Sequence, residues 1–177
     1  MPQLYTRLCI CVLGALLLAW PAGAEAPRRA GSAGVTVALP SGWHSSRPDQ
    51  GRVTNPLTRI VVSSGRIGPD LTSACQTQVS GYTFPQTAVA IVVVEWTKPI
   101  GGMKIGIGPL RPRHFTSGNL PIQRPPAIEC FDGPGGSAQF AEGGHTFGAY
   151  VLLGKKAPAA LAARARAVLD TLRVTRR

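Results

Sequence analysis

Apolar and polar positions along the chain predict several β-strands followed by one helix. The longest apolar run after the N-terminal segment is "TAVAIVVVEW", Thr87–Trp96. Because this run is almost continuous, it indicates a strand that is covered on both faces at the centre of a sheet. Shorter runs of strand-forming residues at Val35–Leu39 and Arg59–Gly65 predict two further strands.

The glycine-rich stretch near the C-terminus predicts antiparallel strands joined by tight turns. Ile128–Phe131 predicts one strand, and a turn at Asp132–Gly136 follows it. Ser137–Glu142 and His145–Leu153 then flank Gly143-Gly144, a dipeptide suited to a two-residue hairpin because glycine adopts positive φ angles readily. Antiparallel strands joined by glycine turns therefore account for the residues of this stretch, and a reactive loop is not needed to explain them.

A two-residue turn at 143–144 also determines which residues of the hairpin face one another. Phe140 is opposite Phe147, an aromatic cross-strand pair that would hold the register. Glu142 is opposite His145, so both would flank a solvent-exposed turn.

The chain ends in an alanine-rich segment, "APAALAARARAVLDTLRV" (157–174), which predicts a helix with proline near its first turn. Helical spacing gathers apolar residues on one face and keeps the arginines away from it; the former are Leu161, Ala165, Val168, Leu169 and Leu172, the latter Arg164, Arg166 and Arg173. We therefore expect an α+β domain, with a mainly antiparallel sheet of about five to six strands and the C-terminal helix packed on it.

Two segments have less regular patterns. Leu71–Val79 predicts a short helix that carries Cys75. Residues 97–126 are rich in proline and glycine, and so long an irregular stretch inside a compact domain indicates a functional or a mobile loop.

The N-terminal segment has the pattern of a secretory signal peptide. Arg7 precedes the apolar run Leu8–Trp20, and the small residues Ala22-Gly23-Ala24 follow it. We expect residues 1–24 to be removed and the mature chain to begin at Glu25. An uncleaved membrane anchor is the alternative, but the apolar run is shorter than the roughly 20 residues that span a bilayer.

After cleavage, the chain divides into a tether and one domain. Residues 25–33 are polar and small, which predicts a disordered tether. Residues 34–174 are long enough for a single globular domain with its own core. We expect the export signal to direct the protein to the cell envelope or the medium, with no transmembrane segment after processing.

Cysteine usage agrees with an oxidising compartment. Cys9 and Cys11 lie in the predicted signal, so Cys75 and Cys130 remain in the mature chain. Exported proteins meet an oxidising environment, which predicts a single Cys75–Cys130 disulfide. No CxxC, HxH or HExxH pattern is present, so we expect no metal site.

The chain is strongly basic, with 19 Lys and Arg against 8 Asp and Glu and a formal net charge of +11 at pH 7. A positive surface attracts phosphates, acidic glycans or anionic lipids, although scattered charges and an excess of arginine over lysine also fit a GC-rich genome. Segment 104–124 has no acidic residue, and its glycines would let backbone amides approach a ligand. Its candidate anion-binding residues are Lys104, Arg111, Arg113, His114 and Arg124. The alternative is a solvated loop whose charges keep the protein soluble.

Motifs of catalysis and nucleotide binding are absent from the sequence. There is no G-x-S-x-G, and the histidines His44, His114 and His145 are expected to be exposed and solvated. Neither "GGMKIGIGP" nor "GPGGSAQF" continues as a Walker A or a dinucleotide fingerprint. Few aromatic residues and no RNA-binding motif argue against nucleic acid. We expect no cofactor and no catalytic residue.

Two short stretches, "VTVALPSGW" (35–43) and "VLDTLRV" (168–174), resemble the PsbP-like α-β-α sandwich class. This class includes many small exported actinobacterial proteins and lipoproteins. The resemblance implies a binding or assembly module, because PsbP-like domains mostly lack catalytic residues. The chain departs from the lipoprotein members, since no cysteine for lipid attachment follows the apolar run.

Together these observations predict an exported, non-enzymatic binding or interaction module of a bacterial cell envelope, a monomer that binds an envelope partner or an anionic ligand. The competing hypothesis is a secreted enzyme whose site lies near the loop 101–126, with His114 and its neighbouring arginines at the centre. A deep pocket with converging polar groups would favour the enzyme, and a flat or grooved surface would favour the module.

Overall fold

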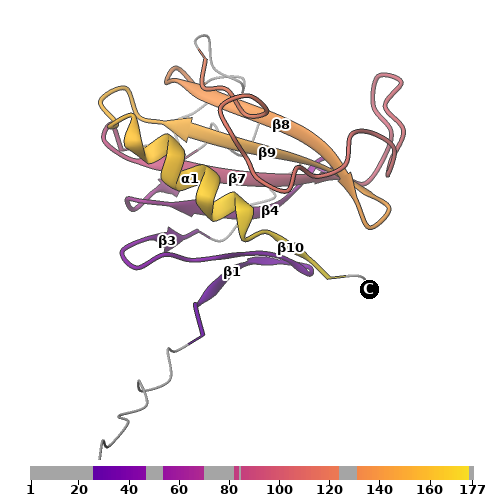
Figure 1. Cartoon of the computed structure of the whole chain (residues 1–177), viewed down its shortest axis with the longest axis horizontal. Coiled ribbons are helices and arrows are strands. Elements are labelled where there is room, and N and C mark those ends of the chain that lie inside the picture. Colours follow the sequence, from indigo (N-terminus) through magenta and orange to yellow (C-terminus); the bar gives the residue numbers. More distant parts are fainter. Residues whose placement is uncertain (1–25, 47–53, 70–81, 84, 124–130, 176–177) are drawn as a thin grey trace, which may run out of the picture.

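The computed structural model describes residues 26–46, 54–69, 82–83, 85–123 and 131–175 (Figure 1). The fold is α+β, as the sequence predicts: two antiparallel sheets of three and five strands, a short two-stranded sheet, and one C-terminal helix, α1 (Ala160–Asp170). The single predicted sheet is therefore divided into separate sheets.

The five-stranded sheet contains the predicted central strand. Its strands lie in the order β3 (His44–Ser45), β4 (Leu57–Ser63), β7 (Val89–Trp96), β9 (His145–Leu153) and β8 (Gly135–Glu142). Strand β7 is third of the five, and every residue from Val89 to Glu95 is buried. The continuous apolar run thus marks the centre of the sheet, as expected.

The three-stranded sheet contains β1 (Arg29–Ser32), β2 (Val35–Ala38) and β10 (Arg173–Val174), with β2 in the middle. Residues 25–33 were expected to form a disordered tether, and this is wrong for the part that forms β1. Polar composition is a poor guide here because β1 pairs residue by residue with β2 through a tight turn at Ala33-Gly34.

The C-terminal helix also ends earlier than the sequence pattern predicts. Helix α1 stops at Asp170, and the chain then turns so that β10 pairs with β2. Short β5 (Gly68–Pro69) and β6 (Tyr82–Thr83) pair with each other in the two-stranded sheet.

The predicted β8–β9 hairpin is confirmed with its register. Phe140 faces Phe147 and Glu142 faces His145. The two phenyl rings are stacked, with centroids 5.5 Å apart. Gly143 and Gly144 adopt φ angles of 61° and 85°, which suit glycine. Strand β8 starts at Gly135, so two glycines expected in the preceding turn belong to the strand.

One face of the large sheet is covered jointly by α1 and by the chain between β7 and β8 (Figure 1). The helix buries Ala162, Ala165, Val168 and Leu169, and Leu172 is buried just beyond it. Leu161 is only partly buried, whereas Arg164 and Arg173 are exposed as expected. Arg166 is half-buried, and its Nε donates a hydrogen bond to the Leu120 carbonyl at 3.2 Å.

The opposite face of the sheet has its own apolar cluster. Val61, Val92 and Leu152 are buried there, and Trp96 and Tyr150 pack against them. Burial raises the pKa of the Tyr150 phenol above its ordinary value, because the tyrosinate anion is poorly solvated there.

We expect Tyr150→Phe to reduce the loss of stability at alkaline pH. Because the phenol releases its proton at lower pH in the unfolded chain than in the folded protein, folding stability is lost as pH rises from about 10 through the raised pKa. Urea denaturation at pH 8 to pH 11 should show a steeper fall for the wild type than for the variant. Parallel pH curves would contradict this expectation.

Some predictions lie outside the described residues: the signal peptide, the helix at Leu71–Val79, both cysteines of the predicted disulfide and Ile128–Cys130. Phe131 is described, and it is not in a strand. No helix in the described part of the chain is long and apolar enough to cross a membrane.

Candidate functional site

The segment singled out by the sequence, here called the β7–β8 loop (residues 97–123), leaves the end of β7 at a defined position. Asn55 holds its start: the side-chain oxygen accepts a hydrogen bond from the Thr97 amide at 2.8 Å, and the side-chain nitrogen donates to the Lys98 carbonyl at 3.1 Å. The chain then extends beyond the end of the sheet before it returns (Figure 1).

The returning part of the loop is attached to the tip of the β8–β9 hairpin. The Gly106 amide donates to Thr146 Oγ1 at 2.8 Å, and a side chain at Gly106 would lie 2.6 Å from the Gly144 carbonyl oxygen. The Ala141 amide donates to the Pro109 carbonyl at 2.7 Å. Glycine is required at 106 both for this close approach and for its φ of 72°.

Arg111 was a candidate anion-binding residue, but the structure uses it inside the fold. Its Nη2 donates to Glu142 Oε1 at 3.1 Å, and its Nε lies 2.8 Å from Glu142 Oε2. Its Nη1 also donates to the Leu172 carbonyl at 2.8 Å. The guanidinium therefore joins the loop, the hairpin and the segment that follows α1, and it is not free for an external anion.

His114 is also engaged within the protein, although most of its side chain is exposed. Its Nδ1 lies 3.3 Å from Asp170 Oδ2, and the Phe115 amide donates to Asp170 Oδ1 at 2.7 Å. The carboxylate at the end of α1 thus holds this part of the loop. His114 is exposed, as expected, but it is not without a partner, because folding brings Asp170 to it from a distant part of the sequence.

Of the four candidate cations that the structure describes, two remain available on the loop. Lys104 and Arg113 are exposed, and neither side chain has a hydrogen bond or an ion pair within the described residues. Lys98, which was not a candidate, has the same exposure, and Asn55 binds only its backbone. Arg124 lies outside the described residues.

The same loop carries the exposed large apolar side chains of the described structure. Ile100 is 50%, Ile107 65% and Leu110 82% exposed. Sequence reasoning missed them because single apolar residues among glycines and prolines have no periodicity. Exposed apolar side chains beside lysine and arginine are typical of surfaces that contact a partner or a membrane.

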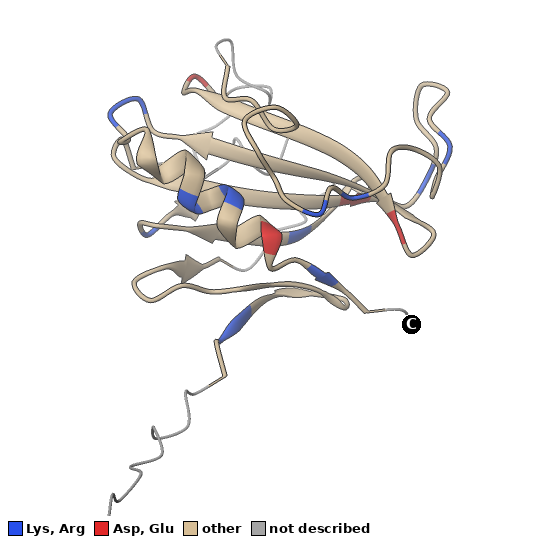
Figure 2. Ribbon diagram, in the orientation of Figure 1, with Lys and Arg blue, Asp and Glu red and all other residues tan. Residues whose placement is uncertain are grey.

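Charge pairing leaves the surface of the described structure positive. Each described acidic side chain, namely Glu95, Asp132, Glu142 and Asp170, is paired with a basic one. Figure 2 shows basic positions in the part of the β7–β8 loop that extends beyond the sheet. The excess of positive charge is therefore not neutralised by free carboxylates in this part of the chain.

A second ionic cluster joins β4, β7 and β9 near the end of β7 from which the β7–β8 loop leaves. Glu95 is buried, and its Oε2 accepts a hydrogen bond from Arg59 Nε at 2.5 Å. Its Oε1 lies 2.5 Å from Nδ1 of His145, whose side chain is half exposed. His145 is exposed, as expected, but one side of its imidazole contacts a buried carboxylate. No hydroxyl or thiol hydrogen-bonded to His145 is recorded among the described residues.

Comparison with protein-family models, with curated proteins and with solved structures found no match. The resemblance to PsbP-like domains therefore stays a prediction. Within the described residues, no three or more His, Cys, Asp and Glu side chains form a group that could hold a metal ion.

Proposed function

We propose that this protein is an exported, non-enzymatic binding module of a bacterial cell envelope, and that it binds an anionic surface through the β7–β8 loop. The observation that carries the proposal is the combination, on one loop, of exposed Ile100, Ile107 and Leu110 with Lys98, Lys104 and Arg113, whose side chains have no partner among the described residues.

The attachment of the loop supports this role. Asn55, Arg111 and Asp170 hold its start and its returning part through hydrogen bonds and ion pairs. A loop held in this way loses less conformational entropy on binding than a free one would. The resemblance of the chain ends to PsbP-like domains agrees with a binding role.

The apolar side chains favour an anionic lipid surface over a wholly polar polymer. Isoleucine and leucine gain free energy by entering the region between headgroups and acyl chains, and each nearby lysine or arginine adds about 1 kcal/mol toward anionic lipid. An acidic polysaccharide would use the cations and leave the apolar side chains in water.

The test is sedimentation of the secreted mature protein with vesicles of phosphatidylglycerol and phosphatidylcholine, at low and high salt. Changing Lys98, Lys104 and Arg113 to Gln removes about 3 kcal/mol, so we expect about a hundredfold weaker binding. Changing Ile100, Ile107 and Leu110 to Ser should also weaken binding, while salt should weaken that of the wild type.

The matched control changes the same number of exposed cations outside the loop, namely Arg66, Lys156 and Arg173, to Gln. Equal losses in the loop and control variants would mean that net charge alone drives binding. If the wild type and the variant with serine at 100, 107 and 110 bind a soluble acidic wall polymer equally well, the polymer is the ligand of the loop. Either result would contradict the lipid proposal.

The alternative function, a secreted enzyme with a site near the loop 101–126, has one supporting observation. The half-exposed imidazole of His145 lies against buried Glu95, an arrangement in which a carboxylate orients a general base. Hydrolysis of chromogenic ester, phosphate or glycoside substrates that disappears in His145→Gln would favour the enzyme. His114, tied to Asp170 at the surface, is a weaker centre.

A further inference from the structure

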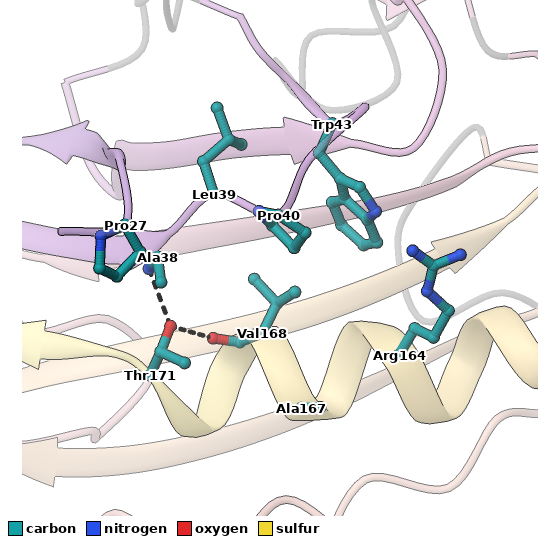
Figure 3. A pocket seen from close by; sticks show the side chains of 9 residues that line it. All are labelled: Pro27, Ala38, Leu39, Pro40, Trp43, Arg164, Ala167, Val168 and Thr171. Carbon is teal, nitrogen blue, oxygen red and sulfur yellow. Dashed lines mark hydrogen bonds between the residues drawn. The ribbon is translucent and has the colours of Figure 1, made fainter. Parts of the chain in front are cut away.

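A pocket of about 280 Å³ lies between α1 and the chain that leaves β2 (Figure 3). It shares no residue with the β7–β8 loop. Apart from one threonine and one arginine, its lining side chains are apolar; the lining residues are Pro27, Ala38, Leu39, Pro40, Trp43, Arg164, Ala167, Val168 and Thr171. Its volume is just below the ~300–1,000 Å³ typical of ligand sites, which limits it to a small ligand.

The hydroxyl of Thr171 in the pocket wall is already hydrogen-bonded within the protein. The Thr171 hydroxyl accepts a hydrogen bond from the Ala38 amide at 2.8 Å and donates one to the Val168 carbonyl at 2.7 Å. The first bond joins β2 to the C-terminal end of α1, and the second lies within the last turn of the helix, as Figure 3 shows. Since the hydroxyl is already satisfied, the interior favours the apolar part of a ligand.

The pocket walls are held by the surrounding structure. Trp43 is 6% and Val168 5% exposed, and both belong to the main core. The Trp43 amide donates to the Pro40 carbonyl at 3.1 Å, which fixes the turn that presents the indole. The cavity is therefore formed before any ligand arrives, which lowers the cost of binding.

Arg164 supplies a positive charge at this pocket. It lies on the same side of α1 as Val168 and Thr171, four and seven residues further along. Its guanidinium lies at the end of the pocket where Trp43 is found (Figure 3). Arg164 is exposed, and its side chain has no hydrogen bond or ion pair in the described part of the chain.

We propose that this pocket binds a small carboxylate with a compact apolar body, in the size range of octanoate. The apolar body packs against Trp43, Leu39 and Val168, and the carboxylate pairs with the forked donors of Arg164. The charge of Arg164, which has no side-chain partner among the described residues, and the apolar wall beside it are complementary to the two parts of such a molecule.

The test is calorimetric titration of the secreted mature protein with three probes: octanoate, octanol and acetate. Octanol keeps the apolar body without the charge, and acetate keeps the charge without the body. We expect saturable binding of octanoate, at least tenfold weaker binding of octanol, and no detectable binding of acetate.

Two variants locate the site. Arg164→Gln should weaken octanoate binding at least tenfold and leave octanol binding unchanged. Ala167→Leu should fill the pocket and abolish binding of both, whereas Ala163→Leu, at another exposed alanine of the same helix, should not. Circular dichroism melting curves verify that each variant is folded.

Three results would overturn the proposal. One is the absence of saturable octanoate binding by the wild type. Another is octanoate binding that survives Ala167→Leu or falls equally in Ala163→Leu. The third is equal binding of octanoate by wild type and Arg164→Gln, which would leave a purely apolar site.

Discussion

Replacing Phe147 by alanine is expected to lower the free energy of unfolding by about 4 kcal/mol, a large part of the stability of a typical domain. Phe147 is 0% exposed, and its ring stacks on Phe140 from the neighbouring strand. Phe115 of the β7–β8 loop reaches the same cluster, with its ring centroid 6.0 Å from that of Phe140. The substitution therefore leaves a cavity where the hairpin and the loop meet.

Urea denaturation followed by circular dichroism measures this change. Leu110→Ala is the control, because Leu110 is also a large apolar residue but is mostly exposed. We expect its effect on the free energy of unfolding to stay within about 0.5 kcal/mol. A similar loss in both variants would contradict the packing argument, and a stable Leu110→Ala protein would confirm that the loop can be altered without unfolding the domain.

Replacing Glu95 by glutamine is expected to cost about 3 kcal/mol of stability, the second large effect. The buried carboxylate accepts from Arg59 and lies against His145, so a neutral amide leaves the partly buried guanidinium without its counter-charge. The same change disturbs three strands at once, because Arg59 belongs to β4, Glu95 to β7 and His145 to β9.

Asp132→Asn is the matched control for the loss of a carboxylate charge. Asp132 pairs with Lys155, but both side chains are largely exposed, so the expected loss is below about 1 kcal/mol. High salt should reduce the small contribution of this surface pair and leave most of the Glu95 effect. Equal losses in the two variants would show that burial of Glu95 does not matter.

The register of the β8–β9 hairpin could be predicted from the local sequence alone. The dipeptide Gly143-Gly144 can form a two-residue turn, and that turn length alone determines that Phe140 faces Phe147. The central position of β7 was equally predictable, because a strand that is apolar on both faces must have neighbours on both sides and layers above and below.

The candidate site was only partly predictable, because a charged residue has the same sequence signal whether it is free or paired. Segment 104–124 has no acidic residue, so its cations were expected to be free. Folding brings Glu142 to Arg111 and Asp170 to His114, 31 and 56 residues away in the chain. What remains for binding is a smaller set of cations together with exposed apolar residues.

The sequence by itself determined the α+β class, the strands β2, β4 and β7, the register of the β8–β9 hairpin and the apolar face of α1, because these depend on periodicity and turn chemistry within a few residues. Tertiary structure decided what depends on distant partners. Strands β1 and β10 are short, and each exists only by pairing with β2. The ion pairs of the loop and the pocket beside Arg164 likewise arise where segments far apart in sequence meet.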